Sequence, residues 1–77
     1  MSTRERVNGN VATLASQIAD GSLAAKPGCY LEVSSFVWNN ASELERAHFE
    51  LVCSRRGVPY EVVQQIGSVD WVCGDGA

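Results

Sequence analysis

The stretch SELERAHFELVCSRRG, residues 42–57, predicts a helix in the middle of the chain. Ser42 stands three residues before Glu45, the spacing of a capping box, in which each side chain accepts a hydrogen bond from the other residue's backbone N–H. Acidic residues then fall in the first turn and arginines in the last, where they complement the helix dipole, and Gly57 can end the helix. We therefore predict a helix over residues 43–56. Its buried stripe is expected to consist of Leu44, Ala47, Leu51 and Val52, widened by Phe49 and Cys53.

The first twenty residues repeat apolar side chains at steps of three and four, which is typical of an amphipathic helix. The start of this helix stays open, because Asn8 or Asn10 can cap it and an earlier start at Thr3 would include Gly9. Gly21 is a suitable C-terminal stop. The inward side chains are Val7, Val11, Leu14, Ala15 and Ile18.

A turn at Pro27-Gly28 separates this helix from residues 29–38, whose β-branched and aromatic side chains predict a strand. Side chains alternate between the two faces of a strand. The core face is expected to carry Cys29, Leu31, Val33, Ser35 and Val37, and the second face Tyr30, Glu32, Ser34, Phe36 and Trp38.

Residues 59–66 fit two structures. Pro59 in a first turn and two glutamines favour a short helix that ends at Gly67, which we prefer. The paired valines and the Gly67-Ser68 loop instead suit a hairpin with the final strand VDWVC, residues 69–73.

The expected fold class is α+β, with two or three helices on a small antiparallel sheet made from residues 29–38 and the C-terminal strand. The element order is helix, strand, helix, then a helix or strand, then a strand. With 77 residues the chain is one domain, residues 1–77, with 74–77 as a frayed tail. Hydrophobic residues make up 45% and charged residues 19%, which is the balance of a folded domain.

The net charge of −3 repels polyanions, so the sequence argues against direct binding to nucleic acid or an anionic membrane. No apolar run is long enough to span a bilayer and the N-terminus lacks the apolar centre of a signal peptide, so we expect a cytoplasmic protein. In that compartment the three cysteines are expected to be small buried hydrophobes. A zinc site of Cys29, Cys53, Cys73 and His48 lacks any Cys-x-x-Cys pair, so neither metal nor cofactor is expected.

Catalysis is not expected. His48 is the only histidine, and on a helix the side chain of Cys53 diverges from it by roughly 140°. The sequence also lacks a nucleotide-binding glycine loop and a paired-carboxylate motif. We predict that the protein is not an enzyme.

Residues 53–66 resemble a helix-turn-helix unit, and the element order resembles a truncated winged-helix domain. Five positions fit the helix-turn-helix spacing: Cys53, Gly57, Val58, Val63 and Ile66. The resemblance implies an alternative function, a small and dimeric DNA-binding regulator. It would contact DNA through Arg55, Arg56, Tyr60, Glu61, Gln64 and Gln65.

The favoured function is binding of a larger protein, whose activity this chain would modulate, inhibition being the expected effect. Aromatic residues are enriched at protein interfaces, and acidic neighbours would orient a basic partner. In profile the chain is similar to small inhibitors carried by phages and plasmids, such as anti-CRISPR and anti-restriction proteins, which implies a nucleic-acid-processing partner. The expected contact residues are Tyr30, Glu32, Phe36, Trp38, Asp70 and Trp71. A third hypothesis is a self-associating assembly subunit, such as a homodimer.

Overall fold

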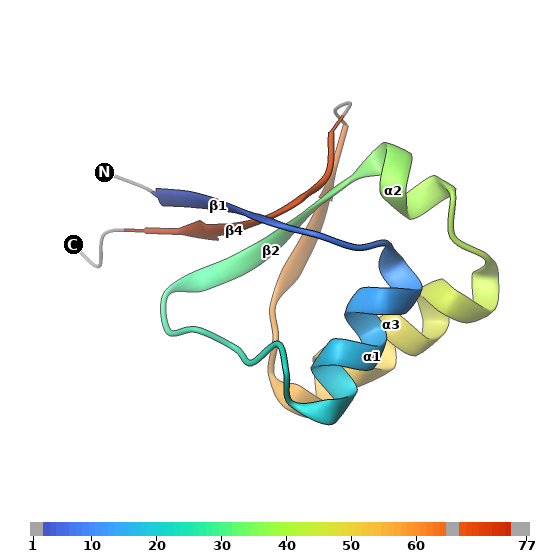
Figure 1. Cartoon of the computed structure of the whole chain (residues 1–77), viewed down its shortest axis with the longest axis horizontal. Helices are drawn as coiled ribbons and strands as arrows, with labels where there is room; N and C mark the ends of the chain where they lie inside the picture. The colour runs from blue at the N-terminus through green and yellow to red at the C-terminus, as the bar shows by residue number, and fades with distance from the viewer. Residues whose placement is uncertain (1–2, 65–66, 75–77) are drawn as a thin grey trace.

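A four-stranded sheet forms one side of the molecule, and two helices lie side by side against it (Figure 1). The computed structural model describes residues 3–64 and 67–74. The architecture is α+β, as the sequence predicts. The elements in chain order are β1 (Thr3–Val7), α1 (Val11–Asp20), β2 (Cys29–Ser34), α2 (Ser35–Asn39), α3 (Glu43–Arg56), β3 (Tyr60–Val63) and β4 (Val69–Cys73).

The strands lie in the order β1-β4-β2-β3. The predicted antiparallel pairing of the strand that starts at Cys29 with the C-terminal strand is confirmed, with Leu31 opposite Trp71 and Val33 opposite Val69. β1 also pairs antiparallel with β4, but β3 pairs parallel with β2. The sheet is therefore mixed, and the expectation of a wholly antiparallel sheet is wrong.

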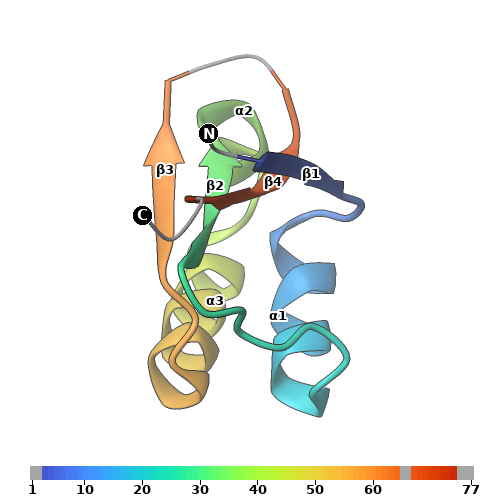
Figure 2. The same cartoon turned by 90° about the vertical axis from the view of Figure 1, so that its left-hand side faces the viewer.

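Both long helices cover the same face of the sheet (Figure 2), with α3 beneath the β3 side and α1 beneath the β1 side. The side chains that alternate inward from β2 and β4 meet the buried stripes of the helices there. This core consists of Val11, Leu14, Ala15, Ile18, Leu31, Val33, Phe49, Val52, Cys53, Val58, Val69 and Trp71.

The N-terminal segment divides into a strand and a helix. Asn10, one of the two predicted caps, accepts a hydrogen bond from the backbone N–H of Thr13 at 2.9 Å, and Gly21 ends α1 with φ 87°. A helix that starts at Thr3 is wrong, because residues 3–7 form β1 against β4. Of the predicted inward residues, Val11, Leu14, Ala15 and Ile18 are buried in α1, whereas Val7 belongs to β1 and is half-buried.

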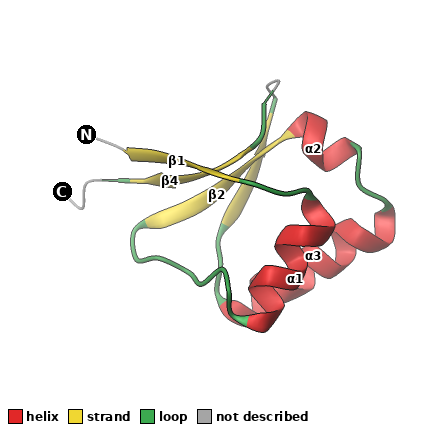
Figure 3. Ribbon diagram, in the orientation of Figure 1, coloured by secondary structure: helices red, strands yellow, loops and turns green. Residues whose placement is uncertain are grey.

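The predicted strand over residues 29–38 is too long (Figure 3). Its first six residues form β2, but the hydroxyl of Ser34 accepts from the backbone N–H of Phe36 at 3.2 Å and caps the short helix α2. Leu31 and Val33 are buried as predicted, but Glu32 and Ser34 of the second face are buried as well, and the strand pattern ends at Ser34. Phe36 and Trp38 project from a helix, not from the second face of a strand.

Helix α3 has the predicted bounds and both bonds of the capping box, 2.9 Å for Ser42 N–H to Glu45 and 3.1 Å for Glu45 N–H to Ser42. Its predicted buried stripe is half right, because Val52, Phe49 and Cys53 are buried but the other three residues are not. Leu44 is 83% exposed, Leu51 is 48% exposed and Ala47 is also exposed. The residues that face the core are Phe49, Val52 and Cys53.

Of the two structures predicted for residues 59–66, the strand is confirmed at residues 60–63, but its hairpin pairing is not. Residues 60–63 are β3, so the preferred helix is wrong, and with it the second helix of the helix-turn-helix unit. The hairpin is also wrong, because β2 lies between β3 and β4 in the sheet. Gly57 turns the chain with φ 66°, and Val58 is buried before the strand begins.

The expectation of three reduced cysteines is wrong. Cys29 and Cys73 are directly opposite on β2 and β4 and form a disulfide, whereas Cys53 is free and buried. A disulfide persists in oxidising surroundings, so this bridge does not support the reducing compartment assumed from the sequence. Beyond the bridge, the N–H of Gly74 donates to the carbonyl of Gly28 at 3.2 Å, and the rest of the predicted tail lies outside the described residues.

In the described part of the chain, no helix has the length and apolar character needed to cross a membrane.

Candidate functional site

Strand β3 has a free edge. The N–H of Leu31 donates to the carbonyl of Pro59 at 2.9 Å, and the parallel register places Leu31 beside Tyr60 and Val33 beside Val62. In a parallel ladder with this register, the odd-numbered residues of β3 bond to β2. The backbone N–H and C=O groups of Tyr60 and Val62 therefore point away from the sheet, and no other strand in residues 3–64 and 67–74 pairs with them.

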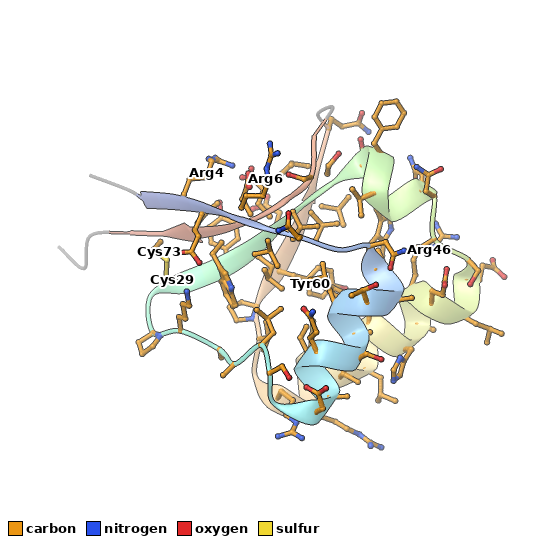
Figure 4. The ribbon with its side chains drawn as sticks, in the orientation of Figure 1. Arg4, Arg6, Cys29, Arg46, Tyr60 and Cys73 are labelled. Carbon is orange, nitrogen blue, oxygen red and sulfur yellow. A yellow bond between two sulfur atoms is a disulfide. The ribbon has the colours of Figure 1, made fainter. Side chains whose placement is uncertain are left out.

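An aromatic cluster lies beside the start of this edge. The rings of Trp38 and Tyr60 are stacked with centroids 5.9 Å apart, and Phe49 meets the edge of both, at 5.9 Å from Trp38 and 5.1 Å from Tyr60. Phe49 is fully buried, whereas Trp38 and Tyr60 are half-buried, so part of each of these two rings meets solvent. Figure 4 shows Tyr60 between the sheet and the helices.

Two adjoining hollows follow α3 beside this cluster. The larger, about 640 Å³, lies between the C-terminal half of α3 and the start of β3, and Tyr60 lines it. The smaller, about 360 Å³, lies between α2 and α3, and Trp38 and Arg46 line it. Glu50 lines both of these shallow hollows, so they adjoin, and we call the two together the α3–β3 groove.

The groove and the edge carry negative charge. Glu50 stands in the groove, and Glu61 is exposed on the opposite side of β3. Burial raises the pKa of the Tyr60 phenol, and the nearby Glu50 and Cys53 raise it further, so Tyr60 is a neutral hydrogen-bonding group at pH 7. Burial also raises the pKa of Cys53 to about 11, so this thiol is protonated and unreactive at pH 7.

The other edge of the sheet, β1, has a different character. Its side chains Arg4, Glu5 and Arg6 are all charged and exposed. Charged side chains on an edge strand oppose pairing with another chain, whereas β3 has a single charge, Glu61, among β-branched and aromatic residues. The two edges therefore differ in their capacity to accept a further strand.

The sheet face away from the helices carries an ion-paired cluster. Arg4 Nη1 lies 2.5 Å from Glu32 Oε1 and 3.1 Å from Asp70 Oδ2, which join β1, β2 and β4. The hydrogen bonds to Glu32 and then Asp70 raise the pKa of Arg4. Figure 4 shows Arg4 and Arg6 on this face. Because Arg4 is paired with both carboxylates, the cluster is better suited to holding three strands together than to attracting a basic partner.

The structure separates the six residues predicted to contact a partner. Tyr30, Glu32 and Asp70 share the face with the ion pairs, because their neighbours Leu31 and Trp71 point to the core. Trp71 is 1% exposed and belongs to the core, with Lys26 Nζ 5.6 Å from its ring. Phe36 is 55% exposed on α2, and Trp38 lines the α3–β3 groove. No single surface contains all six.

The residues of the DNA-binding alternative are also divided. Arg55 and Arg56 end α3, Tyr60 and Glu61 belong to β3, and Gln64 follows it, while Gln65 lies outside the described residues. Two of the four residues considered as zinc ligands, Cys29 and Cys73, form the disulfide and so cannot bind a metal. Among the described residues, no group of three or more histidine, cysteine or acidic side chains could hold a metal.

Sequence reasoning missed Glu50, Val62 and Arg4. Glu50 and Val62 gain their positions only because β3 is a strand at an edge. Arg4 was missed because residues 3–7 have little apolar character, so only the pairing with β4 identifies them as a strand.

Comparison with protein-family models, with curated proteins and with solved structures finds no match to this chain.

Proposed function

We propose that the protein is a non-catalytic interaction module that binds an extended, basic segment of a larger protein along the free edge of β3. The observation that carries this proposal is the outward direction of the backbone groups of Tyr60 and Val62 next to the α3–β3 groove. An extended segment added there forms backbone hydrogen bonds with these groups.

The side chains along the edge define the segment. A side chain on the helix side of the added strand reaches the exposed parts of Tyr60 and Trp38, which suits an aromatic or aliphatic residue. Basic residues on the other side of the added strand meet Glu61, and Glu50 adds to the negative charge of the groove. The net charge of −3 adds a long-range attraction for a basic partner.

When this acidic module binds a basic segment, it would prevent that segment from binding anything else. The partner class that we propose is therefore a larger protein with a basic surface, such as a nucleic-acid-processing enzyme, and the proposed effect is inhibition. The phage and plasmid inhibitors that the chain is similar to in profile act within this class.

The test uses two eight-residue peptides that alternate valine with lysine or valine with glutamate, titrated into the isotope-labelled protein and followed by the NMR signals of its backbone amides. We expect the lysine peptide to bind and to shift the amides of Tyr60 and Val62, with affinity falling as salt rises. The glutamate peptide should not bind.

Val62→Pro is the decisive variant. It removes an outward N–H and leaves the ladder to β2 intact, because proline is tolerated on an edge strand where its nitrogen faces solvent. Val62→Ala is the matched control, which keeps the N–H. Loss of lysine-peptide binding in Val62→Pro alone supports the proposal. Equal binding by both variants, or equal binding of both peptides to the wild type, contradicts it.

A further inference from the structure

The outward face of α3 carries an apolar stripe that the core does not use. Leu44, Ala47 and Leu51 are spaced by three and four residues, so they align along one side of the helix, and all three are exposed. At about 100° per residue this side lies opposite Phe49, which packs in the core.

Charged residues border the stripe in a regular pattern. Glu43 and Glu50, seven residues apart, follow one border, and His48 and Arg55, also seven apart, follow the other. All four side chains are exposed. In heptad terms, Leu44 and Leu51 occupy position a, Ala47 and Ser54 position d, the two glutamates position g, and His48 and Arg55 position e.

This pattern fits a second copy of the same helix. In a parallel pair of helices, a residue at g faces the residue at e that lies five positions later on the other helix. Glu50 then meets Arg55 of the second copy and Glu43 meets His48 of the second copy, and symmetry makes each pair twice. In an antiparallel pair, like borders meet, which would bring glutamates against glutamates.

We infer that the protein forms a parallel homodimer through the α3 stripe, with Leu44 and Leu51 of each copy packed against the same residues of the other. The small side chains of Ala47 and Ser54 let the two helices approach closely. The contact spans a helix of only 14 residues, so the dimer is weak and depends on concentration.

The first test is sedimentation from about 10 µM to 1 mM, a range in which weak association is visible. The mass should rise from 8.3 kDa toward twice that value. Leu44→Glu and Leu51→Glu should each raise the dissociation constant by about tenfold or more, whereas Phe36→Glu, an exposed apolar residue away from the stripe, should not. Circular dichroism checks that each variant is folded. A mass of 8.3 kDa throughout, or dimers that persist in both leucine variants, overturns the inference.

Orientation is tested with charge exchange and with cross-linking. Arg55→Glu should weaken the dimer, and the double variant Glu50→Arg with Arg55→Glu should restore it. Leu51→Cys should form a cross-linked dimer on mild oxidation, while the wild type, whose Cys53 is buried, should not. Residues 44 and 51 are about 10 Å apart along the helix, so cross-linking only in a mixture of Leu44→Cys and Leu51→Cys proteins would show an antiparallel pair and refute the parallel arrangement.

The dimer and the peptide site at β3 are separable. Glu43, Ala47 and Glu50 border both the stripe and the α3–β3 groove, but Leu44 belongs to the stripe alone and Val62 to the strand edge alone. Leu44→Glu should therefore lose the dimer and keep lysine-peptide binding, whereas Val62→Pro should do the reverse.

Discussion

Helices α1 and α3 lie side by side against the sheet, and each repeats apolar residues at steps of three and four. In α1 all of these residues are fully buried. In α3 there are two apolar stripes on opposite sides, of which one packs in the core and the other, at Leu44 and Leu51, meets solvent. The contrast teaches that apolar spacing shows that a helix has an apolar side, but the spacing does not say whether that side packs in the core.

The largest effect should distinguish the two helices directly. Leu14 is fully buried, so Leu14→Ala should lower the free energy of unfolding by about 2–5 kcal/mol, because it removes apolar contacts and leaves a cavity. Leu44→Ala should change it by less than about 0.5 kcal/mol, because Leu44 is 83% exposed. Urea unfolding at low protein concentration measures both. Equal losses would mean that the outward stripe of α3 is part of the monomer core.

Alkaline pH should report on the inward side of α3. Burial raises the pKa of Cys53 from 9.0 to about 11, so the folded state keeps this thiol protonated where the unfolded chain ionises. The free energy of unfolding is therefore at its full value below pH 9. It falls as the pH rises toward 11, by about 1.4 kcal/mol for each unit of difference between the folded and unfolded pKa values.

The measurement is urea unfolding between pH 8 and about pH 11. Tyr60, whose pKa is also raised, titrates in the alkaline range as well. Cys53→Ala is therefore the control, because it keeps the contribution of Tyr60 and removes that of the thiol. The loss in the wild type should exceed that in Cys53→Ala. Identical pH profiles would show that Cys53 is not desolvated and that the inner stripe of α3 is less buried than that of α1.

The N-terminal caps should sharpen the comparison, since each is worth about 1 kcal/mol. Val11 and Leu14 follow the Asn10 cap and are fully buried, so Asn10→Ala should lower global stability. The first turn of α3 is exposed, so Ser42→Ala should mainly speed amide hydrogen exchange of that turn. If faster amide hydrogen exchange is confined to the first turn of the helix in both variants, the two caps do not differ in their effect on global stability.

The smallest effect concerns the contact between the two helix ends. Arg56 Nη2 donates to the carbonyl of Ala19 at 2.6 Å, which satisfies a carbonyl in the last turn of α1. Arg56→Ala should cost about 0.5–1 kcal/mol in thermal or urea unfolding. Arg55→Ala, which removes the adjacent arginine, should leave monomer stability within about 0.5 kcal/mol. The contact is refuted if the two variants cannot be distinguished.

Local chemistry predicted much of the fold. The capping box at Ser42 and Glu45 and the glycine at position 57 gave both bounds of α3, because caps depend on neighbours in sequence. The caps of α1 at Asn10 and Gly21 were among the sequence alternatives for the same reason. The pairing of β2 with β4 followed from two apolar strands that had to share one core.

The errors concern choices that only tertiary structure makes. Residues 60–63 suit a helix or a strand locally, and pairing with β2 selects the strand. Residues 3–7 are polar and become a strand through β4. Of the candidate site, the sequence predicted Trp38 and Tyr60 as contact residues under different hypotheses, but their stacking requires the turn at Ser34 and the strand at β3.

The disulfide between Cys29 and Cys73 also determines how the molecule would respond to mechanical load. Because Thr3 lies opposite Cys73, tension applied to the two ends first separates β1 from β4 and then unravels α1. The load next crosses the disulfide and bypasses the chain between the two cysteines, which are 44 positions apart, so the maximum extension is shortened by about 150 Å at about 3.4 Å per residue. Both α3 and β3 lie within that covalent loop, so the two proposed binding surfaces belong to the part of the molecule that tension cannot reach.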